Sequence, residues 1–185
     1  YPPMDEAGWE KVFSAARDYG MNHLRFHSWC PPEAAFNVAD RMGFYIQVEL
    51  PLWTLNVGED KGTVDFLYNE AAHIMKEYGN HPSFCFWSLG NELQGDFSVM
   101  DKLLTTIKQQ DSRHLYMTTT FTFEPGHGSW PEPNDDFWVT QWTKNGWVRG
   151  QGIFDDQPVS FNKDFSSAIE GLPVPLITHE IGQYS

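Results

Sequence analysis

The spacing of hydrophobic residues along the chain alternates between a helical and a strand-like pattern. Apolar residues that recur every three or four positions predict helices at residues 5–20, 31–43, 63–78 and 97–110, with a further short helix at 164–170. Shorter apolar runs predict strands at residues 22–28, 44–50, 84–89, 115–120, 137–141 and 174–179. A segment rich in Pro, Gly and Trp, residues 121–136, is expected to form a long loop. Such alternation of strands and helices implies parallel strands joined by right-handed crossovers.

This order of elements predicts an α/β fold, a (β/α)8 TIM barrel, with residues 1–185 forming one domain. The long loops follow strands, which in a barrel places them on the face where active sites form. A doubly wound sheet is the alternative fold, but the sequence has neither the Gly-rich turn nor the P-loop of nucleotide-binding sheets. Because a complete barrel has about 250 residues, we expect an incomplete barrel that lacks the first strand and the last strand or strands with their helices.

Charge and composition narrow the classes of partner. Acidic residues outnumber basic ones by 25 to 12, and the net charge of −13 argues against binding of nucleic acid or of an anionic membrane surface. No apolar run approaches the roughly 20 residues that a membrane-spanning helix needs. Eight tryptophans and an aromatic content of 16% supply flat rings on which sugars can stack, although most such rings serve core packing. The cellular location stays open.

A polar pair follows the most strongly apolar of the predicted strands. Pro82 opens this strand and Gly90 closes it, and Asn91 and Glu92 come directly afterwards. Burying a carboxylate is costly unless it is paired or functional, and a glutamate just past the C-terminal end of a barrel strand is typical of a catalytic residue. A glutamate that caps a helix or lies in a turn is the alternative. The strand that precedes Glu92 favours catalysis.

A second glutamate, Glu180, ends the predicted strand at residues 174–179. Two carboxylates that each follow a strand can converge at one barrel mouth, and glycoside cleavage needs such a pair. For Glu180 alone a solvated or helix-capping role would be the simpler interpretation, but the pairing with Glu92 favours catalysis. Strand alternation predicts that the preceding residue, His179, points to the other side as a hydrogen-bonded core histidine.

Three blocks of the sequence carry a resemblance to a known family. They are residues 22–28 together with 39–49, residues 81–92, and residues 175–182. In this order the blocks resemble the catalytic barrel of glycoside hydrolase family 2, which includes β-galactosidases, β-glucuronidases and β-mannosidases. The resemblance implies that Glu92 is the acid/base, Asn91 its sugar-contacting neighbour and Glu180 the nucleophile. Arg25 matches the arginine at the end of the second barrel strand.

This resemblance implies a retaining double displacement on a carbohydrate substrate, with no metal and no cofactor, and additional β-sandwich domains in the full-length protein. Such chemistry needs different pKa values for the two carboxyls. We expect apolar walls such as Trp87 to raise the pKa of Glu92, and a cation such as Arg25 to keep Glu180 ionised. The carboxyl groups are expected about 5–5.5 Å apart for retention or about 6.5–9.5 Å apart for inversion. A separation beyond roughly 10 Å would exclude both schemes.

Further candidate substrate-binding residues lie near strand ends or in loops, namely His27, Trp29, Glu49, Trp53 and Trp142. Each aromatic or histidine ring could line the sugar subsite or serve packing, and Arg25 could also form a structural ion pair with Glu49. The family often has Arg-x-Ser-His-x-Pro where residues 25–31 read Arg-Phe-His-Ser-Trp-Cys-Pro. Its aromatic near the end of the sixth strand has no clear match, and Gln141-Trp142 is the nearest candidate. The sequence therefore leaves the identity of the sugar open.

Two other functions compete with the glycosidase. A metal-dependent hydrolase would use His23 or His27 together with Glu92 and the pair His179 and Glu180. His23 and His27 are four residues apart, a helical spacing, yet they fall on or next to a predicted strand, where a spacing of two would be wanted. A non-catalytic barrel that only binds carbohydrate is the second alternative, and the presence of both glutamates argues against it.

Overall fold

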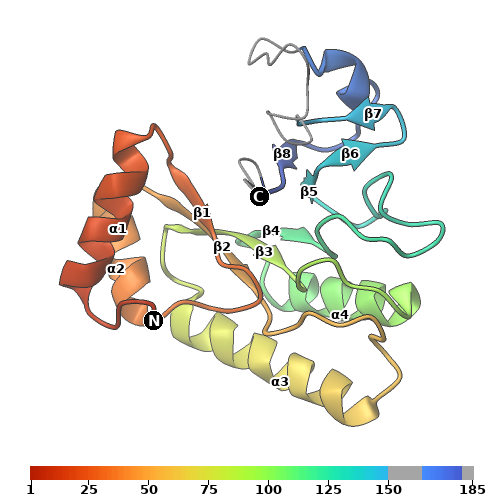
Figure 1. Cartoon of the computed structure of the whole chain (residues 1–185). Coiled ribbons are helices and arrows are strands. Elements are labelled where there is room, and N and C mark those ends of the chain that lie inside the picture. Colours follow the sequence, from red (N-terminus) through yellow and green to blue (C-terminus); the bar gives the residue numbers. More distant parts are fainter. Residues whose placement is uncertain (150–163, 181–185) are drawn as a thin grey trace.

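A central parallel sheet flanked by helices forms most of the protein, as the computed structural model shows (Figure 1). The structure describes residues 1–149 and 164–180. Its helices are α1 (Glu6–Asp18), α2 (Glu33–Met42), α3 (Lys61–Tyr78), α4 (Phe97–Gln110) and the 3-10 helix η1 (Ser166–Ile169). Its strands are β1 (His23–Arg25), β2 (Tyr45–Glu49), β3 (Phe84–Ser88), β4 (Leu115–Met117), β5 (Trp138–Thr140), β6 (Trp142–Thr143), β7 (Gly146–Trp147) and β8 (Leu176–Thr178).

The first four strands form one sheet in the order β1-β2-β3-β4, and every pair in it is parallel. A second parallel pair, β5 and β8, continues from β4, because Asp136 N donates to Tyr116 O (2.7 Å) and Phe121 N donates to Val139 O (3.0 Å). Strands β6 and β7 form an antiparallel hairpin. This strand–helix order confirms the predicted parallel α/β arrangement, and the described strands do not close into a barrel.

Local sequence signals explain where the helices begin and end. The Asp5 carboxylate accepts a hydrogen bond from Gly8 N (2.7 Å) at the start of α1, and Asp60 accepts one from Thr63 N (2.6 Å) at the start of α3. Helix α2 ends at Gly43, whose φ of 72° is the left-handed conformation that glycine adopts without strain. The four predicted α-helices are confirmed, with ends that differ by a few residues.

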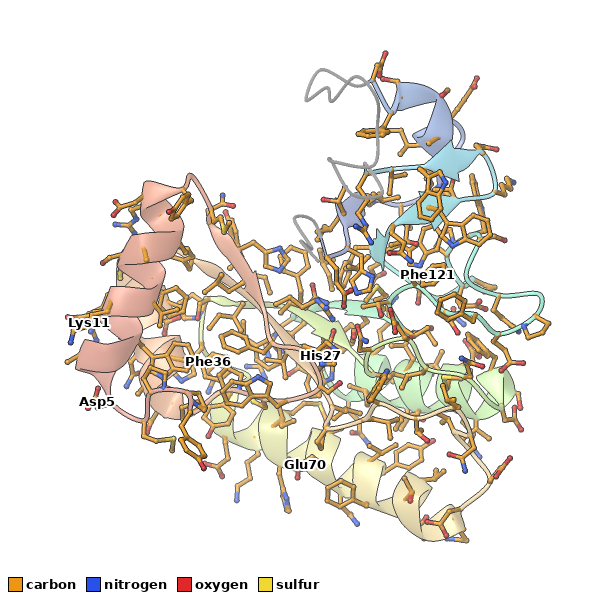
Figure 2. All side chains as sticks on the ribbon, viewed as in Figure 1. Asp5, Lys11, His27, Phe36, Glu70 and Phe121 are labelled. Carbon is orange, nitrogen blue, oxygen red and sulfur yellow. The ribbon has the colours of Figure 1, made fainter. Side chains whose placement is uncertain are left out.

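The two faces of the sheet differ in polarity. On β2, Ile46 and Val48 are buried in the main hydrophobic core with the helices, whereas the alternating residues Gln47 and Glu49 are buried polar side chains. In Figure 2, Phe36 lies beside α2 as part of this core, and Phe121 lies near the C-terminal strands. A charged residue on a buried face needs polar partners. The face that carries Gln47 and Glu49 is therefore where a site can form.

The strands are shorter than their hydrophobic runs predicted, and each ends before the last residue of its run. β1 ends at Arg25 and β4 ends at Met117, so the residues that follow adopt turn conformations instead. The hairpin β6–β7 was not predicted, and the helix expected at residues 164–170 is the single 3-10 turn η1. No helix in the described ranges combines the length and apolarity needed to cross a bilayer.

Candidate active site

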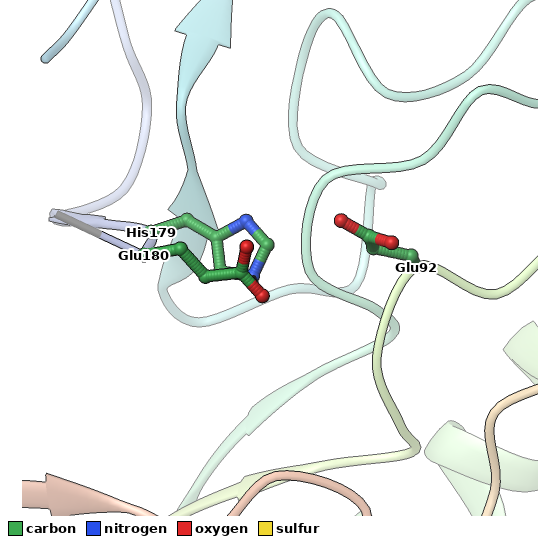
Figure 3. Close-up of side chains that lie close together, drawn as sticks. All are labelled: Glu92, His179 and Glu180. Carbon is green, nitrogen blue, oxygen red and sulfur yellow. Dashed lines mark ion pairs between the residues drawn. The ribbon is translucent and has the colours of Figure 1, made fainter. Parts of the chain in front are cut away.

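The two predicted catalytic glutamates face each other across the open end of the sheets. Glu92 follows β3 and Glu180 follows β8, and Figure 3 shows their carboxylates directed toward one another with the imidazole of His179 beside Glu180. One oxygen of each carboxylate and one ring nitrogen of His179 all lie within 4.8 Å of one another. The structure therefore brings together two side chains that are far apart in the sequence, and the separation lies well below the limit that would exclude glycoside chemistry.

The backbone at both glutamates is in a sparsely populated conformation. Glu92 and Glu180 each have a φ of +50°, and Ser28 has a φ of +57°; within residues 1–149 and 164–180 these are the only non-glycine residues with positive φ. Such residues persist only where their surroundings hold them, and they concentrate at functional sites. All three lie just beyond the C-terminal end of a parallel strand. This shared position makes the C-terminal ends of the strands the candidate site.

Two threonines beyond β4 hold the turn that carries Glu92. Glu92 N donates to Thr120 Oγ1 (2.8 Å), and Leu93 N donates to Thr119 Oγ1 (2.9 Å). Gly90 is needed at the start of the turn, because a Cβ there would lie 2.4 Å from the carbonyl oxygen of Leu52. Hydroxyl groups and a close backbone approach thus position this carboxylate.

Three donors converge on the side-chain oxygen of Asn91, which is nearly fully buried. Arg25 Nη1 donates to Asn91 Oδ1 (3.2 Å), and Thr120 Oγ1 donates to the same oxygen (3.1 Å). Nε2 of His179 lies 3.3 Å from it. These donors assign the orientation of the amide, since the oxygen must face them. The amide NH2 group is then directed away from these three donors.

The guanidinium of Arg25 links a buried carboxylate to the site. Glu49 has a fully buried side chain, and its carboxylate accepts hydrogen bonds from Arg25 Nη1 (2.6 Å), Ser28 N (2.7 Å) and Ser88 Oγ (3.3 Å). Arg25 Nη2 lies 4.0 Å from Glu180 Oε1. The structural ion pair that was one interpretation of Arg25 is therefore present, and the same side chain also faces the second glutamate.

The pKa of the Glu92 carboxyl is raised, first by burial and then by the negative charge of Glu180, while His27 and Arg25 act in the opposite direction. This is the direction predicted for a proton donor. Its cause differs from the prediction in one respect. Trp87 stacks on Tyr116 in the hydrophobic core, on the opposite face of β3 from Ser88, so other residues bury Glu92.

The prediction that His179 is a buried, hydrogen-bonded histidine is confirmed, whereas the prediction that it points away from the site is wrong. Its side chain is fully buried, and Nε2 lies 3.1 Å from Glu180 Oε1. Period-two alternation fails here because β8 already ends at Thr178 and Glu180 has left-handed φ, which turns both side chains toward the same space. Burial lowers the pKa of His179 to about 3, with the positive charges of Arg25, Arg149 and His27 adding to it, so the ring is neutral.

The remaining predicted substrate-binding residues occupy different surroundings. His27 is exposed in the turn after β1, and Trp53 is 65% exposed in the loop after β2. Trp29 packs against the rings of two core residues, Trp9 and Phe26. Trp142, on β6, packs edge-on against Phe121 with ring centroids 5.9 Å apart. Contact of these residues with a sugar stays a prediction.

Sequence reasoning did not identify four hydroxyl residues that shape the site, Ser28, Ser88, Thr119 and Thr120. The threonines had a usable signal, since residues 118–120 are a run of three threonines at the end of the strand predicted at residues 115–120. Buried hydroxyl groups need partners, and partners at a strand end point to a built turn. Two residues of the third block, Ile181 and Gly182, lie outside the described residues.

Comparison with known proteins identifies the family. Residues 4–124 match the family model "Glycosyl hydrolases family 2, TIM barrel domain". A β-glucuronidase of Bacteroides fragilis is 30% identical over 112 residues, which are 55% of this chain and 16% of that protein. A β-galactosidase of Arthrobacter sp. is 27% identical over 97 residues, 48% of this chain and 10% of that protein. Both relatives are thus much longer than the region they share with this chain.

The fold is shared with solved structures as well. A crystal structure of Parabacteroides merdae β-glucuronidase with glycerol in its active site superposes with a TM-score of 0.64 and 21% identity, covering 84% of this chain and 20% of that one. The family match includes Arg25, Asn91 and Glu92, whereas Glu180 lies beyond it. Because the family model matches more than half of the chain, the chain belongs to glycosyl hydrolase family 2, and its residues 4–124 match the TIM barrel domain of that family.

Proposed function

We propose that the full-length protein containing this chain is a retaining β-glycosidase. In the first step the Glu180 carboxylate attacks the anomeric carbon, the glycosidic C–O bond breaks, and Glu92 gives its proton to the departing oxygen. In the second step Glu92, now a carboxylate, takes a proton from water, whose oxygen attacks the anomeric carbon and releases Glu180. Family membership supports the hydrolase class, and the arrangement of the two glutamates supports the mechanism.

The observation that carries this proposal is the short separation of two facing carboxylates. One oxygen of Glu92 and one of Glu180 lie within 4.8 Å of each other. Retaining glycosidases have carboxyl groups about 5–5.5 Å apart, whereas inverting enzymes leave about 6.5–9.5 Å for a water molecule. The short separation favours direct attack by one carboxylate over attack by a water held between the two.

The surroundings of the two carboxyls support different roles for them. Burial and the charge of Glu180 raise the pKa of Glu92, which suits a group that must hold a proton until the leaving oxygen takes it. Glu180 faces the Arg25 guanidinium at 4.0 Å and a ring nitrogen of His179 at 3.1 Å. These two neighbours attract a carboxylate, so Glu180 is suited to attack as the ionised group.

A β-linked sugar is the proposed substrate, with Asn91 binding its 2-hydroxyl group through the amide NH2. Such a contact strengthens as positive charge develops on the sugar ring. The relatives named β-glucuronidase and β-galactosidase indicate which sugars to test first. The β-sandwich domains expected from the resemblance would lie elsewhere in the full-length protein.

A panel of aryl β-glycosides tests the proposal with the full-length protein. We expect release of 4-nitrophenol from a glucuronide, galactoside or mannoside, and a loss of about 100- to 10,000-fold in Glu92→Gln and in Glu180→Gln. The exposed residue Glu170 provides the matched control, since Glu170→Gln removes a glutamate without touching the site. NMR should show the β-anomer as the first product. Release of the α-anomer first would indicate inversion, and binding without turnover would indicate a carbohydrate-binding barrel.

A metal-dependent hydrolase remains the second candidate, because Glu92, His179 and Glu180 lie close enough together to approach one cation. The histidines that this alternative required are placed differently: His23 stacks on Phe86, and neither His23 nor His27 belongs to the group. In addition, His179 Nε2 and Glu180 Oε1 are at hydrogen-bond distance from each other. Activity that survives dialysis against EDTA supports the glycosidase, and loss that zinc reverses supports the metal-dependent enzyme.

A further inference from the structure

The imidazole of His179 lies between two groups that the proposed mechanism needs to hold in place. Its side chain is fully buried, and its Nε2 atom is 3.1 Å from Glu180 Oε1 and 3.3 Å from Asn91 Oδ1. An ionised carboxylate oxygen and an amide oxygen can only accept hydrogen bonds. Asn91 Oδ1 also accepts hydrogen bonds from Arg25 and Thr120, so the amide cannot present its NH2 group to the histidine instead. The proton must therefore be on Nε2.

The other nitrogen of the ring carries no proton. Burial and the nearby positive charges lower the pKa of His179 to about 3, which makes the neutral imidazole the form present at neutral pH. Its Nδ1 atom is buried and has no hydrogen-bond partner among the described residues. A neutral ring with the proton on Nε2 has one donor, and that donor faces Glu180 and Asn91 together.

We propose that His179 is a positioning residue whose single Nε2–H is shared between the nucleophile Glu180 and the sugar-binding amide of Asn91. This inference rests on the proposed function and adds to it a residue that fixes the attacking oxygen relative to the 2-hydroxyl contact. Arg25 does not replace this donor, because its Nη2 is 4.0 Å from Glu180 and its Nη1 is engaged by Glu49 at 2.6 Å.

Loss of this hydrogen bond should affect the reaction more than substrate binding. A carboxylate that can rotate spends less time in the geometry for attack, and small displacements of reacting atoms reduce rates strongly. We expect kcat to fall about 10- to 100-fold in His179→Asn, with a smaller change in KM. In His179→Gln the amide NH2 reaches the position of Nε2, whereas the shorter asparagine reaches only that of Nδ1. We therefore expect His179→Gln to retain several times more activity than His179→Asn.

The pH profile separates positioning from a merely structural role. A donated hydrogen bond favours the ionised carboxylate, so the acidic limb of kcat/KM should move to higher pH in His179→Asn and stay near its original place in His179→Gln. Charged groups that face this pocket from other elements are Arg25 and His27 near β1, Glu92 after β3, and Arg149 after β7. None of them is changed in these variants, so the shift reports on the histidine.

His114 supplies the matched control, because it is a buried histidine that bonds Phe84 O (2.7 Å) in the core. His114→Asn and His114→Gln should reduce stability without moving the acidic limb. The experiment measures kcat, KM and the pH profile of the full-length protein, with thermal unfolding as a check on folding. If the wild type is active and both His179 variants have the same activity and the same acidic limb as the wild type, this inference alone is overturned. An inactive wild type would overturn the proposed function, and this inference with it.

Discussion

Replacing Arg25 should separate its contribution to folding from its contribution to catalysis. In Arg25→Met the carboxylate of Glu49 loses its cation while staying fully buried. Removing one partner of a buried ion pair costs about 3–5 kcal/mol. Arg25 itself is 18% exposed, and the Ser28 N–H and the Ser88 hydroxyl still donate to Glu49. We therefore expect the free energy of unfolding to fall by about 2–3 kcal/mol.

A second substitution should restore stability but not activity. Glu49→Gln in the Arg25→Met background removes the buried charge and keeps an oxygen for Ser28 N, so stability should return to within about 1 kcal/mol of wild type. Asn91 and Glu180 still lack the guanidinium, so kcat/KM should stay low in the double variant. Arg25→Lys is the control that keeps the positive charge but not the planar two-sided donor, and it should lose activity with little loss of stability.

The assay combines calorimetric unfolding of the full-length protein with kcat/KM on the substrate found in the glycoside panel. Recovery of stability without recovery of activity shows that Arg25 acts on the two glutamates separately. If Glu49→Gln leaves the Arg25→Met protein as unstable as before, the buried carboxylate is not what Arg25 stabilises. If the double variant regains full activity, the contacts of Arg25 with Asn91 and Glu180 have no catalytic role.

Three further predictions concern neighbouring groups. Thr120→Val removes the hydroxyl that binds Glu92 N and Asn91 Oδ1, so kcat should fall about 10-fold or more with about 1 kcal/mol of stability lost. The control is Thr106→Val, at a half-buried threonine of α4 whose hydroxyl donates to Lys102 O. In Glu180→Gln the pKa of Glu92 should fall, because the negative charge that raises it is gone; 13C NMR titration of Glu92 measures this, and an unchanged value would contradict the electrostatic coupling. Burial raises the pKa of Asp135 to about 7, above its ordinary value of 3.8. Between these two pH values the folded state therefore binds more protons than the unfolded state, so the free energy of unfolding should decrease as the pH rises from about 4 to 7. Denaturant unfolding across this range should show that slope in the wild type and a flatter one in Asp135→Asn; equal slopes would contradict the assignment.

The hydrophobic pattern predicted the fold well because helices and buried strands impose regular spacing on apolar residues. Capping signals such as Asp5 and Gly43 placed helix ends to within a few residues. Strand ends were the weak point. The runs that predicted strands at 22–28 and 115–120 continue past Arg25 and Met117, where hydrogen bonds to side chains replace the ladder. The hairpin β6–β7 was missed because two-residue strands carry too few positions to show alternation.

The candidate site was predictable in part for a related reason. Glutamates after two apolar strands were visible as Glu92 and Glu180, and the pairing of Arg25 with Glu49 was foreseen as an interpretation. The place of His179 was not, because a period of two was extended beyond the last residue of β8. Which aromatic rings border a pocket depends on loop geometry, and Trp29 lies among core rings even though it follows a strand end.

Left-handed backbone connects the fold to the chemistry of this protein. A non-glycine residue with positive φ costs on the order of 1–3 kcal/mol, and Ser28, Glu92 and Glu180 all adopt it just beyond the C-terminal end of a parallel strand. At Glu92 the surroundings that hold it are the hydroxyls of Thr119 and Thr120, and at Ser28 they include the carboxylate of Glu49. If Glu180 were extended, alternation would send it and His179 to opposite faces. The left-handed turn instead directs both toward Asn91 and Glu92. A glutamate at a strand end therefore identifies this site only in combination with the hydroxyl and carboxylate groups that hold the turns.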